Sequence, residues 1–154
     1  FGGHAMAAGM TLHENDFEHF SHTFDRIVRE HLAPDALEPV IHSDGNIPAD
    51  ELTLQTARAI ASGGPWGQGF EEPIFDDCFE VLSSRIVGDR HWKLVLRLPE
   101  AGTVVDAIAF NHAGPVYRGN VQLAFRLDVN EYRGVENPQL VVEQIAPLSM
   151  ADAC

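Results

Sequence analysis

Five segments in the second half of the sequence alternate apolar and polar residues with a period of two, and this pattern constrains the fold most strongly. Such alternation is typical of strands that bury one face. Five short strands without a long helix between them fit a small Greek-key barrel better than a sandwich, which needs about seven strands. The expected strands are residues 79–87, 92–98, 104–110, 121–129 and 139–145.

The first half of the chain has helical rather than strand periodicity. Asn15 with Glu18 resembles a capping box and predicts a helix over residues 16–32. The apolar residues of this helix recur every three or four positions, so we expect a buried stripe containing Phe17, Phe20, Phe24, Ile27, Val28 and Leu32. Short strands are expected at residues 10–13 and 37–43, and a second helix, capped by Thr53, at residues 54–61. The fold class is therefore α+β.

The run Ser62-Gly63-Gly64-Pro65 marks the clearest boundary, because the period changes from 3.6 to 2 beyond it. We expect one domain portion over residues 1–63, an extended linker rich in aromatic, Gly and Pro residues over 64–75, and the barrel over 76–150. A five-stranded barrel of this size matches the OB type, which binds single-stranded nucleic acid or oligosaccharide across its second and third strands.

The run Gly2-Gly3-His4-Ala5-Met6-Ala7-Ala8-Gly9 predicts a phosphate cradle. Glycine allows close backbone approach to an anion, and a helix starting here would present free N–H groups to it. Most short Gly-rich runs bind nothing, however, so the motif alone is weak. Because only Phe1 precedes it, we expect the sequence to begin inside a domain.

The second expected strand separates a core face from a basic face. Alternation places Trp92, Leu94, Leu96 and Leu98 inside and His91, Lys93, Val95 and Arg97 outside. An arginine beside an aromatic ring suits phosphate contact with base stacking. The candidate nucleic-acid contacts on strands and loops are Arg85, Arg90, Lys93, Arg97, Tyr132 and Arg133. An ordinary solvated strand face explains the same pattern about equally well.

The formal net charge of −13 excludes nucleic-acid binding by bulk electrostatics, so any such role depends on a local patch. No segment resembles a signal peptide or a membrane span. Cys78 and Cys154 lack the spacing of a zinc site. These features favour a cytoplasmic protein with no membrane partner.

No catalytic constellation is present: the sequence lacks a nucleophile elbow, a P-loop and His-rich metal spacing. Asp76-Asp77 is a candidate carboxylate pair for a divalent cation, but adjacent residues of a strand point to opposite faces and a third ligand is missing. A solvated loop entering the first strand is the favoured interpretation, and no metal site is predicted in this chain.

The chain resembles the C-terminal part of the RecJ family of single-strand-specific 5′→3′ DNA exonucleases, in the DHH phosphoesterase superfamily. The matching motifs appear in the family's order along nearly the whole chain. They are residues 2–9, the linker GPWGQGFEEPIF at 64–75, HWKL at 91–94, DAIAF at 106–110 and NEYRG at 130–134. The first motif is common to many DHH phosphoesterases, whereas the linker followed by an OB barrel is much more specific.

The resemblance implies that residues 1–63 complete a DHH-associated α/β domain and that residues 76–150 form an OB domain that binds single-stranded DNA. Gly2, Gly3 and His4 match the family's phosphate-handling motif, and His4 would lie beside the scissile phosphate as an auxiliary catalytic residue. The family's chemistry is two-metal hydrolysis with Mn²⁺ or Mg²⁺ in DNA repair and recombination. Its metal ligands belong to a DHH domain outside this chain, so we expect this chain alone to bind no cofactor and to be inactive.

Two alternatives remain open from the sequence. The barrel can also be interpreted as a protein-docking module, for instance for single-strand binding protein, because an acidic chain suits a basic partner better than DNA. The Gly-Gly-His segment also occurs in other DHH-type enzymes, such as small-oligonucleotide phosphodiesterases and the tail of alanyl-tRNA synthetase. Those proteins lack the linker and OB barrel.

Overall fold

The computed structural model describes residues 2–4, 7–33, 40–88, 90–112 and 117–148. The chain divides into two compact units, Phe1–Val40 and Ile41–Cys154. Neither helix of the described part is long and apolar enough to cross a bilayer.

The first unit contains a two-stranded hairpin and a helix. Strand β1 (Gly2–His4) pairs antiparallel with β2 (Ala7–Gly9). A short 3₁₀ turn, η1 (Glu14–Asp16), leads into α1 (Phe17–His31). The predicted helix is confirmed. The capping box is wrong, because the 3₁₀ turn precedes the helix and Asp16 occupies the cap position without a side-chain bond. The predicted strand at residues 10–13 is also wrong, since the paired segment ends at Gly9.

The apolar stripe of α1 is not a core within its unit. No residue of the helix is buried, and Phe17 and Phe24 expose 63% and 55% of their surface. The expectation of a buried stripe is therefore wrong for this unit. Besides α1, its described part contains only η1 and a two-stranded hairpin, which are too small to cover the apolar face of the helix. The helix is held instead by its backbone and by two ion pairs at i, i+4 spacing, Arg26–Glu30 at 2.7 Å and Arg29–Asp25 at 2.9 Å.

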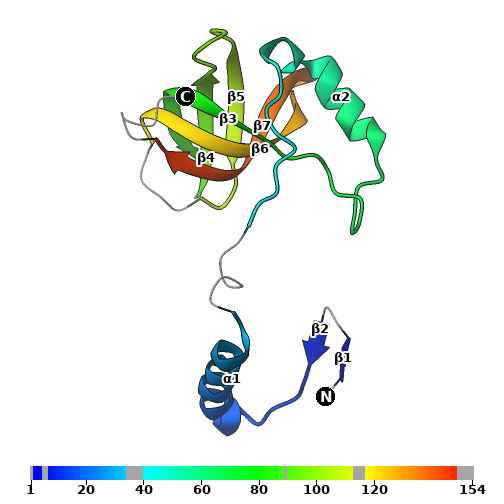
Figure 1. Ribbon diagram of the computed structural model, residues 1–154, viewed down its shortest axis with the longest axis vertical. Coiled ribbons are helices and arrows are strands. Elements are labelled where there is room, and N and C mark those ends of the chain that lie inside the picture. The colour runs from blue at the N-terminus through cyan, green and yellow to red at the C-terminus, as the bar shows by residue number, and fades with distance from the viewer. Residues whose placement is uncertain (1, 5–6, 34–39, 89, 113–116, 149–154) are drawn as a thin grey trace. The chain divides into compact units, whose positions relative to one another are not determined.

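The second unit is a closed five-stranded barrel, which confirms the predicted architecture. Its strands are β3 (Phe75–Val87), β4 (His91–Arg97), β5 (Val104–Ala109), β6 (Gly119–Tyr132) and β7 (Val135–Pro147). They follow the order β3-β4-β5-β7-β6 around the barrel (Figure 1). Only β5 and β7 pair in parallel among the described strands. The order and pairing are those of an OB-type Greek key.

Large apolar side chains fill the barrel, as the period of two predicts. The fully buried set is Phe79, Leu94, Leu96, Val121, Leu123, Phe125, Leu127 and Leu140. The last strand begins at Val135, earlier than the expected residue 139. Arg133 and Gly134, with φ of 54° and 77°, form a two-residue turn, so Tyr132 pairs directly with Val135. The first strand also begins earlier, so Asp76 and Asp77 lie in β3 rather than in a loop.

Helix α2 (Leu54–Gly63) packs on the barrel. The Thr53 hydroxyl accepts a bond from the N–H of Thr56 at 3.2 Å, which confirms the predicted cap. Ala57 is fully buried, and the helix contacts β6 and β7 (Figure 1). A 3₁₀ turn, η3 (Ala49–Glu51), precedes it. The predicted division after residue 63 thus falls inside the second unit, because α2 contributes to the barrel core.

The segment after α2 folds back on the helix. The indole Nε1 of Trp66 donates to the carbonyl of Ile60 at 3.1 Å, and the ring lies 4.8 Å from that of Phe70. Gly67 and Phe70 form a small bridge. The predicted linker therefore contains a compact turn and is not extended throughout. Of the strand predicted at 37–43, residues 37–39 lie outside the described part, and residues 40–43 form no strand.

Candidate nucleic-acid interface

The two faces of β4 separate as predicted. Trp92, Leu94, Leu96 and the following Leu98 are buried, whereas His91, Lys93, Val95 and Arg97 point outward. The outward side chains of β4 lie between those of β3 and β5, because Arg85 is opposite Lys93 and Asp106 is opposite Val95. We call the outward surface of β3, β4 and β5 around these residues the β4 face.

The two predicted cations of β4 each have a carboxylate partner on a neighbouring strand. Lys93 Nζ lies 3.0 Å from Asp106 Oδ2 of β5. Arg97 donates from Nε to Glu80 Oε2 of β3 at 3.0 Å and also forms an ion pair with it through Nη2. A phosphate must therefore compete with these carboxylates, and the β4 face is mixed in charge rather than basic.

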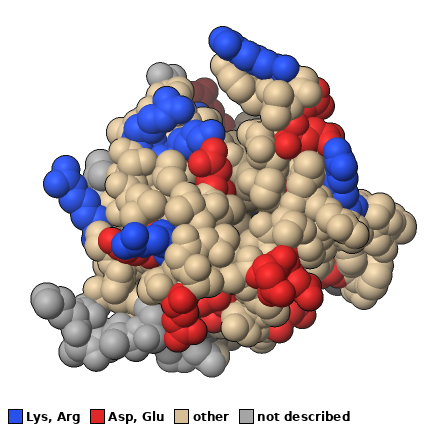
Figure 2. Space-filling view, turned by 90° about the horizontal axis from the view of Figure 1, so that it is seen from above, with Lys and Arg blue, Asp and Glu red and all other residues tan. Residues whose placement is uncertain are grey.

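Four exposed arginines form no ion pair with any residue that the structure describes. They are Arg85 on β3, Arg90 before β4, Arg118 before β6, and Arg133 in the β6–β7 turn. Figure 2 shows separate Lys and Arg side chains over one face of the molecule, some with acidic side chains beside them. The guanidinium carbon of Arg133 lies 5.1 Å from the centre of the Tyr132 ring, so these two neighbouring side chains form a cation–π contact.

Sequence reasoning missed Arg118, although a signal was present. Arg118 follows Tyr117 directly, which repeats the Tyr–Arg order of the β6–β7 turn. The ring of Tyr117 packs 5.6 Å from the buried ring of Trp92. Arg118 is thus anchored beside the barrel core while its own side chain is exposed.

Other cations of the barrel unit are held by acids away from the β4 face. Arg126 of β6 is paired with Glu72 at 2.9 Å and with Glu143 of β7 at 2.6 Å. The hydrogen bond with Glu72 is the main cause that raises the pKa of Arg126, and the hydrogen bond with Glu143 raises this pKa further. Arg58 of α2 is paired with Glu136.

The segment Gly2-Gly3-His4 has a different geometry from the predicted cradle. It is strand β1, in which Gly3 is opposite Ala8 and His4 is opposite Ala7, and it does not start a helix. The prediction of a helix N-terminus here is therefore wrong, because these residues pair with β2 instead. The His4 side chain lies outside the described atoms. Phosphate contact by these three residues stays a prediction.

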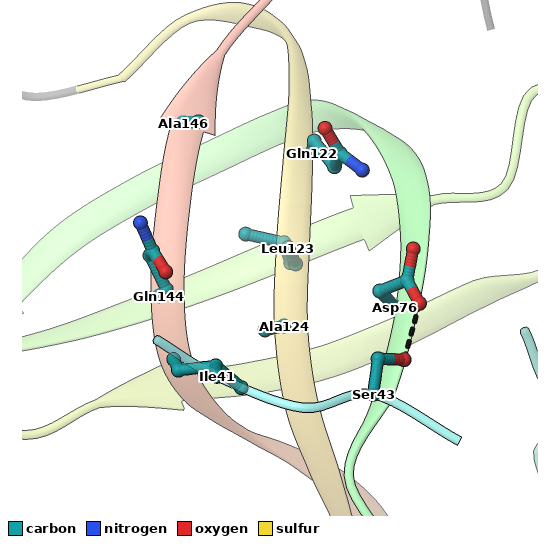
Figure 3. A pocket seen from close by; sticks show the side chains of 8 residues that line it. All are labelled: Ile41, Ser43, Asp76, Gln122, Leu123, Ala124, Gln144 and Ala146. Carbon is teal, nitrogen blue, oxygen red and sulfur yellow. Dashed lines mark hydrogen bonds between the residues drawn. The ribbon is translucent and has the colours of Figure 1, made fainter. Parts of the chain in front are cut away.

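A groove of about 310 Å³ lies on the outside of β3, β6 and β7, beside the segment that carries Ile41 and Ser43. Figure 3 shows the Ser43 hydroxyl bonded to the Asp76 carboxylate. The remaining lining residues are Gln122, Leu123, Ala124, Gln144 and Ala146. Asp76 is the only charged residue among the lining residues, so this groove is unsuited to phosphate.

Asp76 and Asp77 each accept a hydrogen bond from a neighbouring group. Asp76 is bonded to Ser43, and the Oδ1 atom of Asp77 accepts the N–H of the next residue at 2.7 Å. Partial burial is the main cause that raises the pKa of Asp77. Within the described ranges no three His, Cys, Asp or Glu side chains are grouped so as to hold a metal ion. These residues do not fit the Mn²⁺ or Mg²⁺ that the resemblance implies, and no catalytic step is assigned to them.

Comparison with known proteins identifies the same family along the chain. Curated proteins named single-stranded-DNA-specific exonuclease RecJ from Salmonella typhimurium, Dickeya dadantii and Escherichia coli are 42%, 45% and 41% identical over 152 residues. Each alignment covers 96% of this chain and 26% of the relative. The chain thus spans about a quarter of the length of these relatives.

A solved structure supports the fold. The crystal structure of RecJ in complex with Mn²⁺ from Thermus thermophilus matches 96% of this chain and 22% of that chain, with a TM-score of 0.67 and 22% identity. The family model described as the RecJ OB domain matches residues 43–144, which include the whole of β3 to β6 and most of β7. This match favours the RecJ resemblance over the other DHH-type enzymes. The chain belongs to the RecJ OB domain family.

Proposed function

We propose that this chain is the C-terminal, substrate-binding portion of a RecJ-like 5′→3′ exonuclease that acts on single-stranded DNA in repair and recombination. The observation that carries the proposal is the set of exposed arginines without acidic partners, among the described residues, on and beside an OB barrel of this family. In this proposal the single-stranded DNA crosses the β4 face, where Arg85 and Arg90 contact its phosphates. Tyr132 and Arg133 contact the DNA at the β6–β7 turn.

The cleavage chemistry is assigned to parts of the whole enzyme beyond this chain. The related solved structures hold Mn²⁺ or Mg²⁺, and we propose that the whole enzyme uses such a cation. Gly2, Gly3 and His4 would contact substrate phosphate, and the whole enzyme would work in the cytoplasm. We expect no degradation of 5′-labelled single-stranded DNA by this chain with Mn²⁺ present. Chelator-sensitive cleavage by the purified chain would contradict this assignment.

Binding is tested by anisotropy titration of a labelled oligodeoxythymidine at several salt concentrations. Each phosphate neutralised on a single strand contributes about 0.7 to the slope of log K against log salt. The double variant Arg85→Glu/Arg90→Glu should therefore weaken binding and flatten the slope by about 1.4. The control, Arg26→Glu, makes one charge reversal on exposed α1 and should leave the slope unchanged. Equal flattening by both variants would refute a role for the β4 face.

A protein-docking role is the second candidate, and the net charge of −13 favours it. In that case single-strand binding protein is the proposed partner. The same titration separates the two candidates. Salt-dependent oligonucleotide binding supports the DNA-binding proposal. Its absence at every salt concentration, together with saturable binding to single-strand binding protein, supports docking.

A further inference from the structure

An exposed aromatic ring lies at one end of the β4 face. Val105, Ala107 and Ala109 of β5 point into the barrel, and Phe110 directly follows them. Its ring is 55% exposed. Since Ala109 is opposite Trp92, Phe110 lies beside His91, the first residue of β4. An exposed phenylalanine at this edge contributes little to the core and is available to a ligand.

The ring of Phe110 is held by a neighbour whose own orientation is fixed. The Phe110 and His91 rings meet edge to face, with centres 5.3 Å apart and planes at 74°. The backbone N–H of Asn111 donates to Nδ1 of His91 at 3.1 Å. Asn111 adopts a φ of 53°, a left-handed conformation that asparagine tolerates better than most residues. The turn after β5 thus orients the imidazole that supports Phe110.

The two rings together form an aromatic surface at this edge of the barrel. Charge is supplied nearby by Arg90, directly before His91, and by Arg85, on β3 opposite Lys93.

We propose that Phe110, supported by His91, is a stacking platform for one unpaired base of single-stranded DNA. The proposal rests on the proposed DNA-binding function and adds a specific contact to it. An exposed apolar ring on the barrel face that also carries Arg85, which has no ion pair among the described residues, is a combination that suits a single strand, with a base on the ring and a phosphate on the cation. Stacking tolerates any base, because every base has an aromatic face.

The platform predicts a separation between affinity and salt dependence. Loss of one base–aromatic contact lowers affinity by about 5- to 140-fold. A neutral contact releases no counterion, so the slope of log K against log salt stays the same. Phe110→Ala should therefore weaken oligodeoxythymidine binding at every salt concentration without changing the slope. Phe110→Trp keeps a stacking surface and should bind within about 2-fold of the unaltered chain.

Phe70 provides a matched control. It is 56% exposed and contacts one aromatic ring, that of Trp66, but it lies in the segment between α2 and β3. Phe70→Ala should leave binding unchanged. Circular dichroism and thermal melting of each variant show whether the fold is retained. A retained fold with unchanged affinity in Phe110→Ala overturns the proposal, as does an equal loss in Phe70→Ala.

An oligonucleotide with a single abasic site, moved along the strand, provides a direct readout. The unaltered chain should lose affinity when the missing base is the one that stacks, whereas Phe110→Ala should show no additional loss at that position. Position-dependent loss that persists in Phe110→Ala contradicts the platform. If the unaltered chain binds no oligonucleotide at any salt concentration, the proposed function itself fails, which is a distinct outcome.

Discussion

The ion pair between Lys93 and Asp106 offers the sharpest test of how the β4 face meets a phosphate. Lys93 Nζ and Asp106 Oδ2 are 3.0 Å apart, and their side chains are 28% and 43% exposed. A phosphate that contacts Lys93 must therefore approach within about 6 Å of the Asp106 carboxylate. Asp106→Asn removes that negative charge and leaves a side chain of nearly the same shape. We expect this variant to bind single-stranded DNA more tightly.

The size of the effect follows from Coulomb's law. Two unit charges about 6 Å apart repel by ~0.7 kcal/mol at the dielectric constant of water and by ~2.8 kcal/mol at an effective value of ~20. Screening at 0.1 M salt reduces these energies to about half, given a Debye length of ~10 Å. The expected gain in affinity is thus about 2- to 10-fold. The fold should lose no more than about 1 kcal/mol, because both side chains are partly exposed to solvent.

Anisotropy titration of labelled oligodeoxythymidine at several salt concentrations measures both affinity and slope. In Asp106→Asn, Lys93 can contact a phosphate without a competing carboxylate. The slope of log K against log salt should therefore steepen by up to about 0.7. Glu143→Gln is the matched control, because it removes one carboxylate from the same barrel while Arg126 keeps Glu72 as a partner. Unchanged or weaker binding by Asp106→Asn, or an equal gain in Glu143→Gln, would refute competition between carboxylate and phosphate at Lys93.

Three further predictions concern stability. Burial raises the pKa of Asp77 in the folded chain, so ionisation of this carboxyl lowers the free energy of unfolding. The loss of stability is absent below the unfolded pKa and complete above the folded pKa. Asp77→Asn should therefore stabilise the chain in urea melts at pH 7 and lose that advantage near pH 3. A Cβ on Gly64 would lie 2.5 Å from the backbone nitrogen of Trp66, whereas a Cβ on Gly67 would meet open space. Gly64→Ala should therefore lower the free energy of unfolding by about 1–3 kcal/mol in the same melts, and Gly67→Ala should lower it much less. Ala57 is fully buried, so Ala57→Leu should destabilise the barrel by about 1–3 kcal/mol, and an unchanged midpoint would show that α2 is not part of the barrel's cooperative unit.

The barrel was predictable because its signal is local. Each strand carries its own alternation, and the buried positions Leu94, Leu96, Leu123 and Leu127 are those that the period of two selects. The closing order, with β7 between β5 and β6, follows from the few topologies open to five short strands. The boundary of the unit was not predictable in this way, because Ala57 of α2 packs into the core from a segment with helical period.

The charges of the β4 face depend on pairings between strands that are distant in the sequence. Asp106 reaches Lys93, and Glu80 reaches Arg97, only because of the register that places β4 between β3 and β5. The alternation along β4 alone therefore identified the outward cations but not their partners. Phe110 was overlooked for a similar reason, since only the turn at Asn111 and the contact with His91 distinguish it from a residue that ends a strand.

Local and total charge act at different distances, which reconciles an acidic chain with the proposed DNA binding by the barrel. At physiological salt, exposed charges separated by more than about 8 Å are largely screened, so most of the net charge of −13 does not reach a bound phosphate. What a phosphate senses is its immediate surroundings, where Arg85 and Arg90 have no acid partner among the described residues and Lys93 has one. The total charge instead opposes the long-range attraction that speeds encounter with nucleic acid. In the proposed binding mode, affinity depends on a few arginines with no ion pair among the described residues and on uncharged stacking, for which Phe110 would supply the surface.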